Sequence, residues 1–232
     1  MEKCFYELMS TIILNEDVPV DEVQSVLAGI ISYSMLQDEQ LKDQHRQTGF
    51  KPYVFSGPYP LEPDRIYRER RMYRFHLRTP NLSFALAMKR CLPTGNRVAK
   101  FVSVEMKNFT EEHIGELISL TPIVSTVSNR CWMPENGLGL LAERLHVNAS
   151  KKCKVLDASF KAPDEYFFEH IELLNRKPIL VKYKSKGAVL LGHKVRLRVK
   201  ANDWAQQLAY TALTLGLSEK NTLGFGYCLA RR

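Results

Sequence analysis

The sequence Gly216-Leu-Ser-Glu-Lys-Asn-Thr-Leu-Gly-Phe-Gly226, followed by Tyr-Cys-Leu-Ala-Arg-Arg232, is the most informative stretch of this chain. A glycine, a polar run containing Lys220 and a Gly-Phe-Gly triplet precede an apolar segment typical of a strand. Glycine adopts positive φ and has no Cβ, so this composition lets successive amides turn toward an anion. We interpret the stretch as a phosphate-binding loop; the alternative is a plain tight turn with Phe225 and Tyr227 in the core.

The loop resembles the C-terminal signature of the CRISPR-associated endoribonucleases of the Cas-six family, a Gly-Leu-(Gly/Ser)-x-Lys-(Asn/Thr)-(Ser/Thr)-hydrophobic-Gly-Phe-Gly motif. Positions 217–226 match it almost residue for residue, with Ser218 where glycine is frequent. Related RNA-binding CRISPR subunits share this loop, so it indicates the superfamily before it indicates cleavage. The resemblance implies RNA contacts from Gly216, Ser218, Lys220, Asn221, Thr222, Gly224, Phe225 and Gly226.

The composition is that of a basic globular protein. The chain has 232 residues, is 45% hydrophobic and carries 33 Lys and Arg against 25 Asp and Glu, which leaves a net charge of +8. This balance favours a polyanionic partner without choosing among RNA, DNA and membrane headgroups. Five scattered cysteines without a Cys-x-x-Cys pair predict neither a zinc site nor a disulfide framework. With no leader and no membrane-length apolar run, we expect a soluble, cytoplasmic protein, and the family resemblance implies a prokaryotic one.

The first half of the chain alternates strand and helix patterns. Residues 4–14 predict a strand, and residues 21–31 predict a helix with apolar residues at helical spacing. A polar segment at 36–48 and a short strand within 49–57 follow. The remaining patterns are an alternating strand at 71–78, a helix at 81–92 capped by Asn81, and a strand at 98–106.

The second half is less regular. We predict a strand at 118–127, an amphipathic helix at 164–175, two strands within 179–199, a helix from Asn202 to about 215 and a last strand at 224–230. The order strand, helix, strand, strand, helix, strand in the first half is the ferredoxin-like arrangement. With the family resemblance, it predicts an α+β protein of two tandem ferredoxin-like domains, residues 1–112 and 113–232.

One histidine lies where the Cas-six family often has its catalytic histidine. His45 follows the first helix and precedes Gly49-Phe-Lys-Pro-Tyr-Val-Phe-Ser56, which resembles a family strand with a lysine at the position of Lys51. The resemblance implies a catalytic set of His45, Lys51 and Tyr33. Without the resemblance, His45 reads as an ordinary surface histidine and Tyr33 as a packing residue.

Basic side chains on two strands are further candidates for RNA binding. Six arginines lie between residues 65 and 78, and Arg71, Arg74 and Arg78 lie on the alternating strand; a solvated basic face is an equally good interpretation. Lys184 lies with Lys182 and Lys186 on one face of a predicted strand. No acidic or histidine cluster has metal-ligand spacing, so we expect neither a metal nor a cofactor.

The leading hypothesis, implied by the resemblance, is a metal-independent endoribonuclease that cuts CRISPR precursor RNA within its repeats and leaves 2′,3′-cyclic phosphate and 5′-hydroxyl ends. A non-catalytic RNA-binding subunit of a CRISPR effector complex is the alternative, and a domain acting on a nucleotide or small molecule is a third. The expected partner is CRISPR repeat RNA, as precursor and as processed guide. Association with other effector subunits or with a second copy stays open, and no membrane is expected.

Overall fold

The computed structural model describes residues 4–94, 97–183 and 187–232, and the chain divides into two compact units. The first unit comprises Met1–Thr110, Val181–Ala188 and Thr222–Gly224. The second comprises Glu111–Leu180, Val189–Asn221 and Phe225–Arg232. Short segments of the second half of the sequence therefore belong to the first unit.

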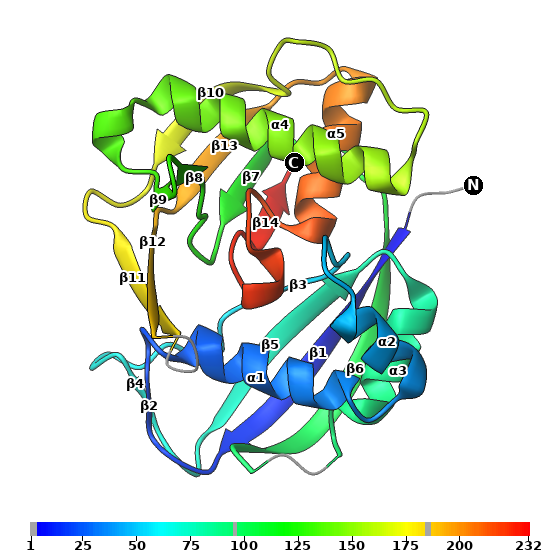
Figure 1. Ribbon diagram of the computed structural model, residues 1–232, viewed down its shortest axis with the longest axis vertical. Coiled ribbons are helices and arrows are strands. Elements are labelled where there is room, and N and C mark those ends of the chain that lie inside the picture. The colour runs from blue at the N-terminus through cyan, green and yellow to red at the C-terminus, as the bar shows by residue number, and fades with distance from the viewer. Residues whose placement is uncertain (1–3, 95–96, 184–186) are drawn as a thin grey trace. The chain divides into compact units, whose positions relative to one another are not determined.

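The first unit has a four-stranded sheet in the order β3-β5-β1-β6 (Figure 1). The first strand of the motif lies between the third and the fourth, and all pairs are antiparallel, which is the ferredoxin-like topology. Its elements are β1 (Cys4–Leu14), β2 (Val18–Pro19), α1 (Val23–Met35), α2 (Glu39–Arg46), β3 (Val54–Phe55), β4 (Ile66–Tyr67), β5 (Met72–Thr79), α3 (Leu82–Cys91) and β6 (Ala99–Thr110).

The core of this unit follows from the alternation of its strands. Leu8 and Ile12 of β1 are fully buried, and the inward positions of β5, Tyr73, Phe75 and Leu77, are buried as predicted. Helices α1 and α3 lie along one face of the sheet (Figure 1). The side chain of Asn81 accepts a hydrogen bond from the Phe84 amide at 3.0 Å and so begins α3 where the sequence predicted.

The second unit repeats the topology, with a sheet in the order β10-β13-β7-β14. The prediction of two tandem ferredoxin-like folds is confirmed. Its elements are β7 (Glu116–Ser119), β8 (Thr126–Val127), β9 (Arg130–Cys131), the 3-10 turn η1 (Pro134–Asn136), α4 (Leu138–Leu156), β10 (Phe168–Leu173), β13 (Val195–Val199), α5 (Asp203–Leu215) and β14 (Cys228–Arg231). The hairpin β11 (Ile179–Tyr183) and β12 (Ala188–Gly192) and the turn η3 (Asn221–Leu223) complete the chain.

The helix predicted at 164–175 is wrong, because this segment contains strand β10 instead. The apolar residues between Phe167 and Leu173 fit either period, and antiparallel pairing with β13 supplies the backbone hydrogen bonds that decide for a strand. The first helix of this unit is α4, which the sequence analysis missed. Its buried stripe includes Leu141, Leu145 and Ala149 at helical spacing.

Several element boundaries also differ from the predictions. The strand predicted at 118–127 is divided into β7 and β8 around Pro122, which has no N–H to donate. Three strands lie within 179–199 instead of two, and the last strand begins at Cys228 because the preceding Gly224 and Gly226 have φ of 82° and 74°. The polar segment at 36–48 contains the short helix α2.

Candidate functional site

Helix α2 places His45 in its last turn. The Asp38 carboxylate accepts hydrogen bonds from the amides of Gln40 and Leu41 at 3.1 and 3.2 Å, which caps the start of the helix. The buried Leu41 anchors it to the first unit. The Lys51 ammonium donates to the backbone carbonyl of His45 at 2.8 Å, so His45 and Lys51 lie together.

The environment of His45 favours its neutral form. Partial burial lowers the pKa of the imidazole, and the positive charge of Lys51 lowers it further. Burial also lowers the pKa of Lys51. The Nδ1 atom of His45 is buried and has no hydrogen-bond partner within the part of the chain that the structure describes. A neutral imidazole beside an ammonium can accept a proton while the cation stabilises a nearby negative charge.

Lys51 also lines a small cavity of about 140 Å³, bounded by Gln44, Gln47, Phe50 and Asn81 among others. Tyr33 lies elsewhere, on the exposed side of α1, where it lines a second hollow of about 530 Å³ with Gly29 and Arg97. The two hollows share no lining residue. The structure thus brings Lys51 to His45 and places Tyr33 in a different hollow.

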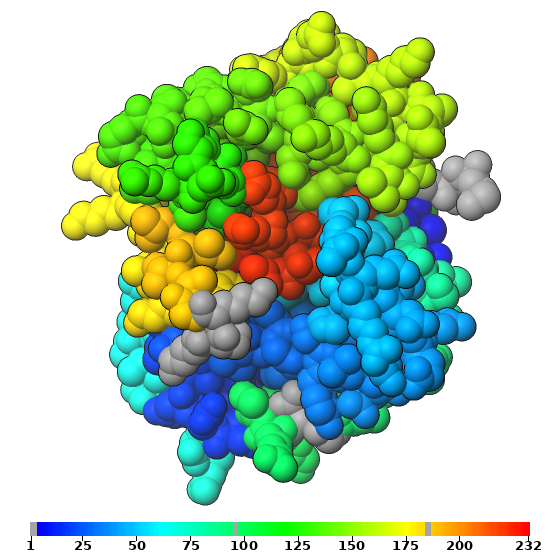
Figure 2. Space-filling view, in the orientation of Figure 1, coloured from blue at the N-terminus to red at the C-terminus, as the bar shows by residue number. Residues whose placement is uncertain are grey.

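The glycine-rich loop is tied to the second unit by its own backbone. The Leu217 amide donates to Gly226 O at 2.8 Å, and the Gly226 amide donates to Pro122 O at 2.8 Å. The hydroxyl of Ser218 donates to Val124 O at 2.6 Å. Gly216, Ser218 and Lys220 have φ of 82°, 65° and 61°. Atoms of this C-terminal segment, drawn in red, reach the surface in Figure 2.

The predicted RNA-binding residues of the loop differ in accessibility. Ser218, Asn221, Gly224, Phe225 and Gly226 are buried, and Gly216 is buried behind them. Lys220 and Thr222 are half-buried and present their side chains more openly. A phosphate would therefore meet the loop through Lys220 and Thr222, because the amides of Leu217, Glu219, Phe225 and Gly226 already donate to backbone carbonyls.

Gly224 has a packing reason as well as a conformational one. A Cβ at this position would lie 2.3 Å from Gln24 Oε1 and 2.5 Å from Phe55 Cε2. Substitution of Gly224 would thus disturb the first unit even without RNA.

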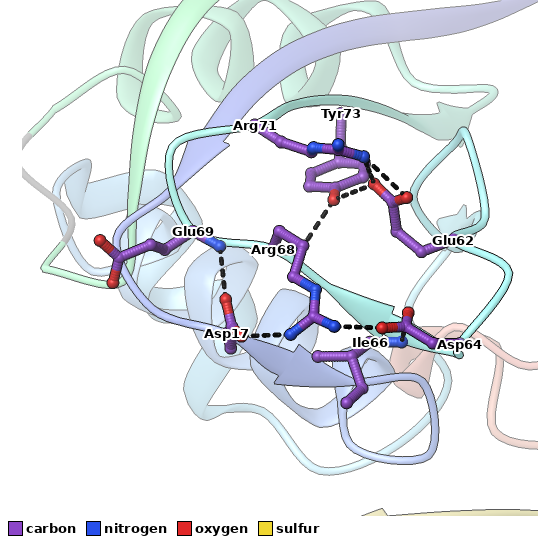
Figure 3. Close-up of polar contacts among 8 residues, drawn as sticks. All are labelled: Asp17, Glu62, Asp64, Ile66, Arg68, Glu69, Arg71 and Tyr73. Atoms are coloured by element: carbon purple, nitrogen blue, oxygen red, sulfur yellow. Dashed lines mark hydrogen bonds and ion pairs between the residues drawn. The ribbon is translucent and has the colours of Figure 1, made fainter.

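The arginine-rich segment is largely paired with acidic side chains (Figure 3). Arg71 donates to both Glu62 oxygens at 2.9 Å, and the pKa of Glu62 is lowered by its hydrogen bond from Tyr73 and then by Arg71. Arg68 pairs with Asp17 at 2.7 Å and with Asp64. These ion pairs offset much of the basic charge of the segment.

The other predicted basic contacts fall into three environments. Arg78 is 6% exposed, pairs with the buried Glu7 and lies over the Phe5 ring at 5.4 Å. Arg74 is exposed on the same face of β5. Lys184 lies outside the described residues. Arg71 and Arg74 are therefore both exposed, whereas Arg78 is buried.

Two general properties complete the description. Among residues 4–94, 97–183 and 187–232, no three His, Cys, Asp or Glu side chains are grouped so that they could hold a metal ion. No helix in these ranges combines the length and the hydrophobicity needed to cross a membrane.

The sequence analysis missed one residue of the loop's surroundings, Lys152 of α4. Its ammonium donates to the carbonyls of Gly216 and Ser218, each at 2.6 Å. It lies in the run Lys151-Lys152-Cys153-Lys154, which reads as a solvated charged face. No sequence signal distinguishes it from its neighbours.

The chain is similar to known proteins in sequence and in fold. No protein-family model matches it. It is 24% identical over 230 residues to the CRISPR-associated endoribonuclease Cas6 2 of Methanocaldococcus jannaschii, covering 91% of this chain and 94% of that protein. Two solved structures share the fold. A CRISPR-associated Cas6 protein has a TM-score of 0.72 at 18% identity, covering 98% of this chain and all of the other. The product of a Cas6-related gene from Pyrococcus furiosus has a TM-score of 0.70 at 16% identity, covering 98% and 99%.

Proposed function

We propose that this chain, a member of the Cas6 family, is an endoribonuclease that cuts CRISPR precursor RNA within its repeats without a metal ion. The similarity to an endoribonuclease over 91% of the chain supports RNA cleavage. The observation that carries the chemistry is the hydrogen bond from Lys51 to the His45 carbonyl, which holds the ammonium close enough to lower the pKa of the imidazole.

The proposed reaction is a transesterification within the RNA. The 2′-oxygen attacks the adjacent phosphorus, the bond from phosphorus to the 5′-oxygen breaks, and the products carry a 2′,3′-cyclic phosphate and a 5′-hydroxyl. His45 takes the 2′ proton or donates one to the leaving oxygen, a role suited to an imidazole that is neutral near pH 7. Lys51 stabilises the charge that develops on the phosphorane oxygens. Tyr33, the third residue of the predicted catalytic set, lines the second hollow and is assigned no proton transfer here.

The glycine-rich loop, residues 216–226, is the proposed site of contact with an RNA phosphate. Its positive φ values orient backbone groups, and Lys220 adds charge. The net charge of +8 attracts the polyanion over longer distances. Binding and cleavage are thus assigned to different residues.

The proposal is tested with a labelled repeat RNA incubated in excess chelator, beside RNAs carrying one 2′-deoxy sugar at each candidate position. A single cut that persists in chelator and disappears at one deoxy position supports attack by the 2′-hydroxyl. Cleavage that stops in chelator and returns with a divalent cation would contradict metal independence. Tight binding without any cut would favour the alternative, an RNA-holding subunit.

The two accessible arginines of β5 and its preceding turn should differ in their effect on RNA affinity. Arg74→Gln should weaken binding and reduce the slope of log K against log salt by about 0.7, the value for one phosphate contact on a single strand. Arg71→Gln should have a smaller effect, because Glu62 already pairs with this guanidinium. Titrations at several salt concentrations measure both slopes. Equal losses for the two variants would contradict the assignment.

A further inference from the structure

Lys152 is a charged side chain inside the second unit. It is 3% exposed, whereas its neighbours Lys151 and Lys154 on α4 are exposed. Ala149 and Cys153 belong to the same buried stripe. A buried ammonium costs free energy unless hydrogen bonds replace its hydration. A lysine at this position therefore needs a specific set of acceptors.

The structure supplies these acceptors from the end of α5 and the start of the glycine-rich loop. The Lys152 ammonium donates to the carbonyls of Leu215 at 3.3 Å, Gly216 at 2.6 Å and Ser218 at 2.6 Å. An ammonium has three N–H donors, which matches these three carbonyls. Carbonyls at a helix C-terminus lack intrahelical partners and carry partial negative charge. Lys152 thus caps α5 and the first residues of the loop together.

The capped carbonyls belong to a segment with an unfavourable backbone conformation. Gly216 and Ser218 both have positive φ, and Ser218 pays the steric cost of its Cβ in this region. Leu217, between them, donates its amide to Gly226, which links the start of the loop to its end. A change in the carbonyls at 215–218 would therefore be transmitted to the Gly-Phe-Gly end.

We propose that Lys152 is a positioning residue for RNA binding, which holds residues 215–218 in the conformation from which the glycine-rich loop binds an RNA phosphate. This inference rests on the proposed function. Lys152 is buried and makes its hydrogen bonds to carbonyl groups, so it acts on RNA through the loop.

The proton of Lys152 is linked to this conformation. Burial lowers its pKa to about 7, while Cys228 of β14 and Glu219 of the loop, the ionisable groups that face it, oppose this shift. Deprotonation of Lys152 would leave two N–H donors for three carbonyls, so this set of hydrogen bonds needs the charged side chain.

The first test compares Lys152→Met with the matched controls Lys151→Met and Lys154→Met in single-turnover cleavage of repeat RNA. Loss of charged hydrogen bonds should raise the half-saturating concentration of K152M by roughly 10- to 100-fold. Its saturating rate and its salt slope should stay those of the wild type, because His45 is untouched and no phosphate contact is lost. An unchanged half-saturation, a reduced salt slope, or an equal loss in either control would overturn the proposal.

The second test needs no RNA, and it separates a local loosening of the loop from a general loss of folding. Hydrogen exchange of the Leu217 and Gly226 amides is compared at one pH among wild type, Lys152→Gln and the matched control Lys151→Gln, with the amides of β13 as the reference. Faster exchange of Leu217 and Gly226 in K152Q alone, with β13 unchanged, supports Lys152 as the group that holds the loop. Unchanged exchange of the two amides overturns it, and so does an equal increase in β13. Faster exchange of the two amides in a protein that neither binds nor cuts RNA would instead refute the proposed function and leave only the loop contact.

Discussion

Replacement of His45 by alanine should lower the single-turnover cleavage rate by roughly 10²- to 10⁴-fold, the usual contribution of a general acid or base. RNA affinity should stay close to that of the wild type, because the imidazole is half-buried and the proposed binding contacts lie in other residues. The measurement is a single-turnover time course at saturating protein, with the dissociation constant measured separately on a 2′-deoxy substrate.

The pH dependence of this rate provides an independent check. If neutral His45 accepts the 2′ proton, the rate rises with pH through the imidazole pKa. This midpoint should lie below the ordinary value of about 6.5, because burial and then Lys51 lower the pKa. In Lys51→Met the midpoint should move upward, since one of the two causes is removed. A midpoint that stays fixed in this variant would contradict the coupling.

The matched control for His45 is His113→Ala, which removes an exposed histidine that lies outside the proposed site. It should cleave at the wild-type rate. Equal rates for wild type and H45A would return His45 to the ordinary surface histidines. Equal losses in H45A and H113A would show that histidine removal acts through something other than proton transfer at the end of α2.

Replacement of Gly226 by alanine should destabilise the second unit by roughly 2–5 kcal/mol, the sum of a left-handed backbone cost and an overpacking cost. Gly226 has φ of 74°, and a Cβ there would lie 1.9 Å from the carbonyl oxygen of Leu217. That contact cannot be relieved by a side-chain rotation, because the crowded atoms belong to the backbone. Urea unfolding measures the loss.

Tryptophan fluorescence is a suitable probe, because Trp132 and Trp204 are the two tryptophans of the chain and both lie in the second unit. The matched control is Gly137→Ala, whose φ is 86° but whose Cβ would meet nothing within 4 Å. It should lose only a backbone cost of about 1–3 kcal/mol, because its φ and ψ of 86° and 139° lie in a region that non-glycine residues rarely adopt. Equal losses in the two variants would show that the contact with Leu217 contributes nothing.

The sequence by itself determined the elements whose pattern admits one interpretation. The strict alternation of β5 predicted its buried face, and Asn81 and Asn202 marked the starts of α3 and α5. The resemblance of two short motifs, around His45 and in the C-terminal loop, to those of the Cas-six family predicted the fold. His45 and Lys51 proved to be adjacent because only five residues separate them and a helix ends between them.

Tertiary structure decided the features that depend on partners distant in sequence. The segment of β10 fits helical and strand periods equally, and only pairing with β13 selects the strand. Arg71 and Arg78 look alike in sequence, yet Glu62 neutralises one at the surface and Glu7 holds the other inside. Lys152 is one of three lysines in a four-residue run, and it is buried because the carbonyls of α5 and the glycine-rich loop lie opposite that side of α4. Local pattern contains no information about such partners, since folding alone brings them together.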